Sequence, residues 1–323
     1  MRGQIKKNLI YFLMFALFIT IISVSYLTSN DKKYKIIFIS KALDKFTPFW
    51  GTMQQGMYAA EKEYGVELEI VGVEDETQVE KQKILLTEAI ESKPDAIILC
   101  AASYTQLDSI CDNINGPVLI TVDSDIQSPK RLGYIGTNNY EAGRELGRIL
   151  SSKVSESDKI LFISSIEGTS SIMERERGFM SSLTGKQKGQ IVGPFYCETI
   201  VEKSYEISKK ALAENPSIKW VIGMNEPSVT GSVLAINELT AESGISVLGI
   251  DTSKTVIKGL EYGVVDTVLV QKPFNMGYQS IKYAVDAIKG EKLEAHIDTG
   301  FQVVNKGNMY SKENQKLLFI FAD

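Results

Sequence analysis

The feature that most constrains this chain is an internal repeat of its strand pattern. Residues 35–40 read Lys-Ile-Ile-Phe-Ile-Ser, and residues 159–164, 124 positions later, read Lys-Ile-Leu-Phe-Ile-Ser. Two further strands recur at nearly the same spacing: residues 95–100 as 219–224, and residues 118–123 as 246–251. Three strands that recur in the same order at a near-constant offset indicate two copies of one folding unit.

Each copy has the pattern of a parallel α/β unit. Short β-branched segments alternate with longer amphipathic segments, which predicts βαβ units. Residues 67–71 and 134–136 supply further strands, and residues 53–64 a helix. A length of 323 residues also suggests about two domains. The predicted fold class is therefore α/β, with two doubly wound parallel-sheet domains joined by a hinge that the chain crosses three times.

The predicted domains follow from this repeat. They are an N-terminal membrane anchor (1–30), an N-terminal lobe (34–137 plus 271–300) and a C-terminal lobe (138–270 plus 301–323). The hinge crossings are expected near residues 137–138, 270–271 and 301–302, because the last strand of each half precedes a passage into the other half.

The N-terminal segment predicts the location of the protein. Residues 8–29 contain no charged side chain and are about as long as a helix that spans a bilayer. Arg2, Lys6 and Lys7 precede this segment and favour an external position for the rest of the chain, although the lysines at 32–33 weaken that bias. No cleavage site of small residues and no lipid-accepting cysteine stands out. We expect an uncleaved single-pass anchor in the cell membrane, with a cleaved signal peptide as the alternative.

Composition argues against several classes of function. A net charge of −5 gives no reason to expect a nucleic-acid partner. Cys100, Cys111 and Cys197 form no metal-binding pattern and are interpreted as buried thiols, with one disulfide as the alternative. With a single histidine, His296, and no nucleophile motif or phosphate-binding loop, we expect no catalysis, no metal and no cofactor.

The candidate ligand site follows from the architecture. Open parallel sheets bind ligands just outside the carboxyl ends of their strands. In this chain that rule selects the loop at 41–50, Asp123, Ser124, Asn225, Glu226, Asp251 and Gln271. Carboxylates and carboxamides can form paired hydrogen bonds with adjacent hydroxyl groups. The rings of Phe49 and Trp50 offer flat apolar faces for the C–H side of a sugar.

Each of these side chains also has a structural interpretation. Asp123 and Asp251 follow strands and could cap the next helix, as aspartate often does. Either Phe49 or Trp50 could belong to the core. The Asn-Glu-Pro sequence at 225–227 could simply begin a helix, since proline favours the first helical turn.

Six motifs in order give the chain a family resemblance. They are Thr-Pro-Phe-Trp at 47–50, Ile-Thr-Val-Asp at 120–123, Gly-Thr-Ser-Ser at 168–171 with Arg175 and Gly178, Met-Asn-Glu at 224–226, Gly-Ile-Asp at 249–251 and Val-Gln-Lys-Pro at 270–273. Over residues 35–304 the chain resembles the ribose-type periplasmic sugar-binding proteins, whose fold is shared by the ligand domains of lactose-repressor-like regulators.

The resemblance implies a set of sugar contacts. It assigns them to Phe49, Trp50, Asp123, Asn225, Asp251 and Gln271, and we add Ser124 and Arg175 to the candidate ligand-binding residues. Arg175 matches an arginine that neighbours a sugar-binding one in the family.

Three departures from the family pattern change the expected ligand. Ser124 and Met173 stand where the family often has sugar-binding arginines, and Ile250 replaces an aromatic residue. A site without two fixed guanidinium groups is not expected to be specific for ribose. The sequence therefore predicts a pentose or a small hexose as the ligand.

The architecture leaves two binding roles. A helix-turn-helix segment, which a transcription regulator needs near its N-terminus, is replaced here by the apolar segment. An anchored protein suits a sugar sensor that stays beside a membrane partner such as a histidine kinase. The alternative is the substrate-binding component of an ABC sugar importer, whose partner would be the permease.

Overall fold

The computed structural model describes residues 11, 14, 15, 20, 33–43, 48–239 and 244–319. The chain divides into two units, Met1–Tyr34 and Lys35–Asp323. Within the described residues no helix is both long and apolar enough to cross a membrane. Most of the predicted anchor, residues 8–29, lies outside them.

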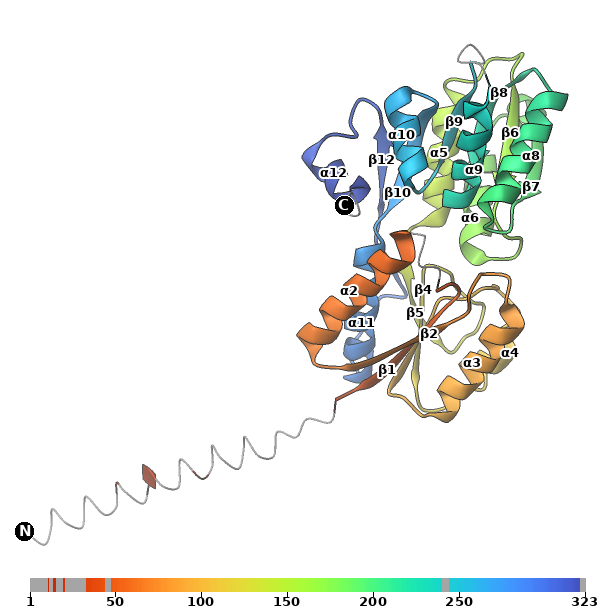
Figure 1. The fold of residues 1–323 in the computed structure, drawn as a ribbon. Helices are drawn as coiled ribbons and strands as arrows, with labels where there is room; N and C mark the ends of the chain where they lie inside the picture. The colour runs from red at the N-terminus through yellow and green to blue at the C-terminus, as the bar shows by residue number, and fades with distance from the viewer. Residues whose placement is uncertain are drawn as a thin grey trace, which may run out of the picture. The chain divides into compact units, whose positions relative to one another are not determined.

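Two six-stranded sheets form the larger unit (Figure 1). The first has the order β11-β5-β4-β3-β1-β2 and the second β12-β10-β9-β8-β6-β7. The strands of the first sheet are β1 (Lys35–Ser40), β2 (Glu67–Gly72), β3 (Ala96–Leu99), β4 (Val118–Val122), β5 (Arg131–Gly136) and β11 (His296–Asp298). Those of the second are β6 (Lys159–Ser164), β7 (Ile191–Tyr196), β8 (Ile218–Gly223), β9 (Ser246–Ile250), β10 (Val265–Gln271) and β12 (Phe301–Asn305).

The helices that connect and cover the strands alternate with them along the chain. They are α2 (Pro48–Tyr64), α3 (Val79–Glu91), α4 (Asp108–Cys111), α5 (Asn139–Ser151), α6 (Ser170–Ser181), α7 (Gly185–Lys188), α8 (Val201–Glu214), α9 (Glu226–Asn237), α10 (Lys254–Tyr262), α11 (Pro273–Ile288) and α12 (Lys312–Leu318).

The strand orders confirm the α/β class with two related sheets. β1 to β5 take the same places in the first sheet as β6 to β10 take in the second. Every pairing in the first sheet is parallel; for example, Ile36 of β1 lies opposite Ala96 of β3. The second sheet departs from the expectation of all-parallel sheets at its edge, because β12 runs antiparallel to β10.

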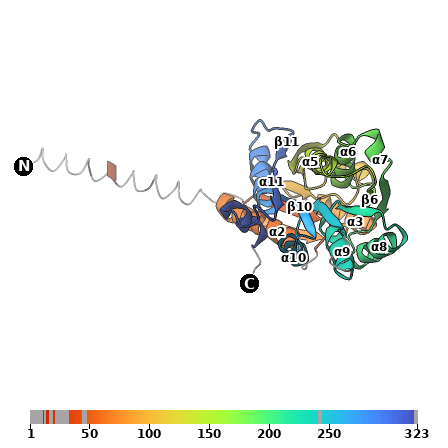
Figure 2. The same cartoon turned by 90° about the horizontal axis from the view of Figure 1, so that it is seen from above.

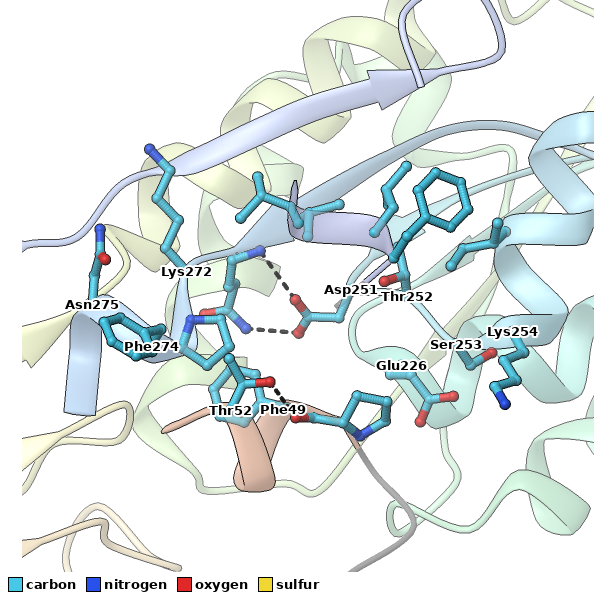
Figure 3. A pocket seen from close by; sticks show the side chains of 18 of the residues that line it. Phe49, Thr52, Glu226, Asp251, Thr252, Ser253, Lys254, Lys272, Phe274 and Asn275 are labelled. Atoms are coloured by element: carbon cyan, nitrogen blue, oxygen red, sulfur yellow. Dashed lines mark hydrogen bonds between the residues drawn. The ribbon is translucent and has the colours of Figure 1, made fainter. Parts of the chain in front are cut away.

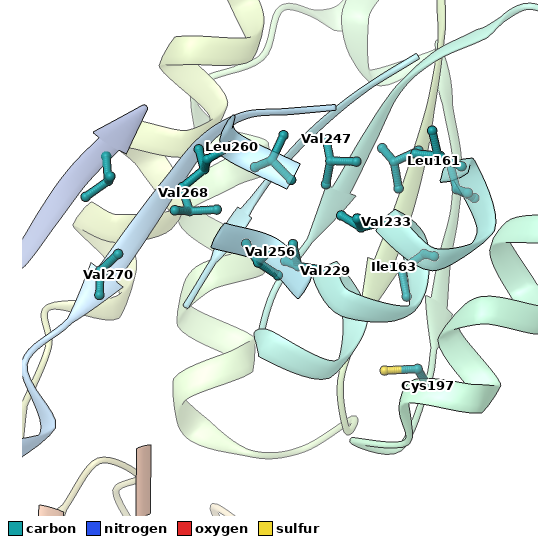
Figure 4. Close-up of a cluster of buried hydrophobic side chains, with 14 of the residues drawn as sticks. Leu161, Ile163, Cys197, Val229, Val233, Val247, Val256, Leu260, Val268 and Val270 are labelled. Carbon is teal, nitrogen blue, oxygen red and sulfur yellow. The ribbon is translucent and has the colours of Figure 1, made fainter. Parts of the chain in front are cut away.

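Helices cover both faces of each sheet, which explains why central strands such as β3 and β4 are almost continuously apolar. In the second sheet, Leu161 of β6 and Val247 of β9 pack with Val233 of α9 and Leu260 of α10 (Figure 4). Cys197 belongs to the same cluster. All three cysteines are free and buried, as the interpretation as buried thiols expects.

One closely packed helix pair supports each sheet. α2 packs against α11 in the first lobe (Figure 2), and α5 packs against α6 in the second. Glycines allow both contacts, because a Cβ atom at Gly56 would lie 2.1 Å from the Phe274 carbonyl oxygen and one at Gly178 would lie 2.0 Å from that of Tyr140.

The chain passes between the two sheets at three places. These passages follow β5, β10 and β11, and the last one consists only of residues 299–300. α11 and β11 therefore complete the first lobe from the far end of the sequence. Gln271 is the last residue of β10 and belongs to the second sheet, whereas the predicted lobe boundary put it in the first.

Candidate functional site

A cavity of about 370 Å³ lies at the carboxyl ends of strands from both sheets. Seven of the eight candidate ligand-binding residues line it: Phe49, Trp50, Asp123, Arg175, Asn225, Asp251 and Gln271. Ser124, the eighth, is fully buried behind Asp123 and hydrogen-bonds to it. The cavity is within the size range of sites for small ligands.

On the first lobe, Asp123 is held by a buried lysine. Lys41 Nζ lies 3.1 Å from Asp123 Oδ2, 3.1 Å from Glu76 Oε2 and 2.8 Å from Ser124 Oγ. Cys100 also donates to Asp123 Oδ2 at 3.5 Å. Burial acts to lower the pKa of Lys41, but attraction by Asp123 and Glu76 outweighs it and raises that pKa. The ammonium group therefore stays charged beside its two carboxylates.

Asp251 takes the matching position on the second lobe. Its Oδ2 accepts from Gln271 Nε2 at 2.7 Å, and its Oδ1 accepts from the Gln271 backbone N–H at 3.2 Å. Burial raises the pKa of Asp251, and the nearby Arg175 only partly offsets that effect. The cap of α10 is Ser253, so Asp251 does not have the structural role of a helix cap.

Both aspartates have a left-handed backbone, with φ of 61° at Asp123 and 68° at Asp251. This conformation costs an ordinary residue about 1–2 kcal/mol, and aspartate tolerates it better than most. The same strained geometry at the equivalent strand end of each lobe aims one carboxylate from each side at a shared cavity. This symmetry is the structural counterpart of the repeat in the sequence.

Arg175 begins a hydrogen-bond path that crosses between the lobes at Asn139 and Tyr134. Its Nε donates to Asn139 Oδ1 at 2.8 Å, and its Nη1 donates to the Met224 carbonyl at 2.8 Å. Asn139 in turn donates to Tyr134 Oη, and Tyr134 donates to the Asp123 carbonyl. These bonds form a continuous path from α6 in the second lobe to the Asp123 loop in the first.

Asn225 has both of the roles considered from the sequence. It caps α9, with its Oδ1 accepting from the Ser228 N–H at 3.2 Å. It also lines the cavity, where its Nδ2 donates to Ser165 Oγ at 2.8 Å. The amide that the resemblance assigns to the sugar is therefore already hydrogen-bonded on both sides.

The two aromatic residues share the wall of the cavity. Trp50 is 6 % exposed and Phe49 is half-buried, and their rings meet edge to face with centroids 5.0 Å apart. Lys41 Nζ lies 5.8 Å from the Trp50 ring centroid. Trp50 thus belongs partly to the core while presenting an apolar surface to the site.

A second cavity of about 470 Å³ adjoins the first (Figure 3). It shares Phe49, Glu226, Asp251 and Gln271 with the ligand cavity and extends between α10 and the start of α11. In Figure 3, Asp251 and Phe274 face this space from opposite lobes. The Asp251–Gln271 pair therefore separates two neighbouring spaces.

Contacts across the lobes border the site. Ser124 Oγ lies 3.1 Å from Ser171 Oγ, and the Asp125 N–H donates to Ser170 Oγ at 2.6 Å. The Tyr104 N–H donates to the Gly168 carbonyl at 2.9 Å. The loop at 168–171, selected from the sequence as a family motif, thus touches the first lobe.

Sequence reasoning did not single out Lys41, and it missed Glu76, which lines the cavity, and Asn139, which belongs to the hydrogen-bond path beside it. Lys41 was inside the loop selected at 41–50, and the signal that could have singled it out is a lysine directly after a buried strand. Glu76 lies in an acidic run, Glu-Asp-Glu at 74–76, that reads as a solvated turn. Within the described part of the chain, no group of three or more His, Cys, Asp or Glu side chains could hold a metal ion.

The comparisons with known proteins agree with this architecture. The family model described as "Periplasmic binding protein domain" matches residues 36–292, and the chain belongs to this family. The ribose import binding protein RbsB of Escherichia coli is 24% identical over 238 residues, which cover 74% of this chain and 76% of that protein. The relatives are binding proteins rather than enzymes, in agreement with the expectation of no catalysis.

Solved structures are similar over most of the chain. A carbohydrate transporter solute binding protein from Agrobacterium radiobacter, in complex with D-arabinose, has a TM-score of 0.83 and 27% identity, and the match covers 90% of this chain and all of that one. The XylFII–LytSN complex matches with a TM-score of 0.76 and 24% identity, over 85% of this chain and 98% of that one.

Proposed function

We propose that this chain binds a monosaccharide, a pentose or a small hexose, in the cavity between its two lobes, which close on the ligand. The observation that supports this proposal most directly concerns Gln271. Its Oε1 is buried and has no hydrogen-bond partner among the described residues. An unpaired buried acceptor costs about 1–3 kcal/mol, which a ligand hydroxyl would recover. Asp123 and Asp251 supply further acceptors, and Trp50 and Phe49 an apolar wall.

The relatives support this class of ligand. RbsB of Escherichia coli is named for ribose, and the Agrobacterium protein holds D-arabinose. Ribose and D-arabinose are both neutral pentoses. Ser124 and Met173, which replace arginines of the family pattern, argue against ribose itself as the ligand of this chain.

Calorimetric titration of the purified full chain tests this proposal. D-ribose, D-allose, D-arabinose and D-glucose form the panel, with a chelator present throughout. We expect one of them to bind at one site per chain, because the cavity supplies its own acceptors and needs no metal. Failure of all four sugars to bind, or loss of binding caused by the chelator, would contradict the proposal.

We further propose that the protein is a membrane-tethered sensor, with its lobes outside the cell, that signals to a partner such as a histidine kinase. The apolar segment at 8–29 supports a tether, which raises the effective concentration of the lobes beside a membrane partner. In the XylFII–LytSN complex a protein of this fold is bound to a second protein. The alternative role, delivery of sugar to an ABC permease, is favoured by the name of the import relative.

Two measurements separate these roles. Mass spectrometry of the membrane fraction should find the N-terminal segment intact. Deletion of the gene should abolish a sugar-induced transcriptional response while uptake of the labelled sugar continues. A mature protein that begins near Lys32, or a deletion that stops uptake and leaves the response to intracellular sugar intact, would favour the importer.

A further inference from the structure

A lysine buried beneath the cavity carries a further inference, which rests on the proposed sugar-binding function. Lys41 is 4 % exposed and shares its ammonium group between Glu76 and Asp123. A buried charge is tolerated only when it is paired. The three residues come from the loops that follow β1, β2 and β4, so one ammonium group holds together three loops at the cavity.

The contacts of Asp123 leave one oxygen for a ligand. Lys41, Ser124 and Cys100 all approach its Oδ2. Asp123 Oδ1 is then the oxygen that can accept a hydrogen bond from a hydroxyl group of the ligand. Lys41 is thus a positioning residue. It fixes the orientation of Asp123, and its own charge is balanced by carboxylates of the protein.

The charge balance of this cluster is negative. When ionised, Glu76 and Asp123 carry two charges against the one of Lys41; burial raises the pKa of Glu76, and attraction by Lys41 only partly offsets that rise. On the other lobe the charge of Arg175 acts on Asp251. The described residues that line the cavity comprise seven acidic and two basic side chains: Glu74, Asp75, Glu76, Asp123, Glu198, Glu226 and Asp251 against Lys41 and Arg175. An anionic ligand would meet an excess of like charge in a poorly solvated space.

We propose that Lys41 and Glu76 set the charge class of the ligand: the site binds uncharged monosaccharides and excludes sugar acids and sugar phosphates. Both basic groups are already engaged, Lys41 by two carboxylates and Arg175 by Asn139 and the Met224 carbonyl. Among the described residues that line this cavity, an acidic sugar therefore meets repulsion from carboxylates, and both basic side chains there already have partners. The hydroxyl groups of a neutral sugar, in contrast, can donate hydrogen bonds to the carboxylates of the cavity.

Glu76→Gln tests the inference by a gain of binding. It removes one negative charge, leaves the Lys41–Asp123 pair in place and keeps the shape of the side chain. We expect the binding of D-glucuronate or D-ribonate by the purified full chain to strengthen about tenfold relative to the binding of the neutral sugar, so the measured quantity is the ratio of the two affinities. The gain should shrink as ionic strength rises.

The matched control is Glu74→Gln. Glu74 is two residues away and also lines the cavity, but its side chain is 83 % exposed, so water and salt screen its charge. We expect it to leave the ratio of acidic to neutral sugar binding unchanged.

A second pair of variants tests the role of Lys41, through its ion pair with Glu76. Lys41→Met leaves two carboxylates facing one another and should weaken neutral-sugar binding by at least about tenfold. The double variant Lys41→Met/Glu76→Gln should recover part of that loss, because one of the two unpaired carboxylates is then neutral. Thermal unfolding of both variants separates a loss of sugar binding from a loss of folding.

Four outcomes decide the inference. It is overturned if the unmodified chain binds acidic sugars as well as neutral ones, or if Glu74→Gln and Glu76→Gln shift the ratio equally. Absence of recovery in the double variant overturns the part of the inference that concerns Lys41. A chain that binds no neutral sugar overturns the proposed function, and this inference with it.

Discussion

At the scale of single residues, the site depends on two aspartates whose charge and backbone are both constrained. Asp251→Ala removes a charged acceptor from the cavity and should weaken sugar binding by about 2–4 kcal/mol. The chain should stay folded, because Asp251 lies at a strand end beside the cleft and caps no helix. Calorimetry and thermal unfolding together measure the two effects.

Ser253→Ala is the control for this substitution. Ser253 is the true N-cap of α10, with its hydroxyl oxygen accepting from the Val256 N–H at 3.3 Å. Its loss should cost about 1 kcal/mol of stability and leave sugar affinity unchanged. If Asp251→Ala instead lowers stability and preserves affinity, Asp251 is a structural residue.

The raised pKa of Asp251 adds a dependence on pH. Because burial raises this pKa, the native chain holds the proton up to a higher pH than the unfolded chain does. Between the ordinary pKa and the raised one, the contribution of Asp251 to the free energy of unfolding therefore declines as the pH rises. Asp251→Asn should remove this decline, which urea unfolding at a series of pH values would detect. An unchanged slope would contradict the assignment.

At the scale of elements, the contact between α2 and α11 requires backbone atoms to approach closely. In Gly56→Ala the new Cβ would lie 2.1 Å from the Phe274 carbonyl oxygen, which belongs to the backbone and cannot rotate away. We expect the free energy of unfolding to fall by at least about 2 kcal/mol. Gly51→Ala in the same helix meets no atom within 4 Å and should stabilise the chain by up to about 1 kcal/mol. Equal effects in urea unfolding would show that the helices can separate without cost.

The elements also show what the sequence could predict. The recurring strands β1, β3 and β4 and their counterparts β6, β8 and β9 were predicted correctly, because they are buried apolar segments whose pattern repeats in the second half. The strands β7 and β11 have no such pattern and were not predicted. The antiparallel β12 was missed, since direction depends on the short passage at 299–300 and no local pattern encodes it. The pairing of Lys41 with Asp123 was missed for a similar reason, as it joins residues 82 positions apart in the sequence, from 41 to 123.

At the scale of the whole molecule, three passages of the chain between the lobes predict a hinge. Saturating sugar should lower the radius of gyration of the lobes in solution scattering, because the acceptors that face the cavity come from both sides of it. The Asp251→Ala chain at the same sugar concentration is the control and should scatter as the sugar-free protein does. Identical profiles for the unmodified chain with and without sugar would rule out closure.

The return of α11 and β11 to the first lobe has a consequence for biosynthesis. A nascent chain that has left the ribosome up to residue 272 contains every strand of the second sheet except β12. Its first lobe, however, still lacks the helix α11 and the strand β11. Until α11 emerges, the face of α2 that carries Met53 and Met57 has no partner helix. The lobe that is translated first therefore stays incomplete until β11 has emerged, through most of the synthesis of the chain. Incompletely folded lobes of this kind expose apolar surface that favours aggregation. If the chain crosses a membrane, as proposed above, this delay keeps the first lobe from completing its fold before translocation.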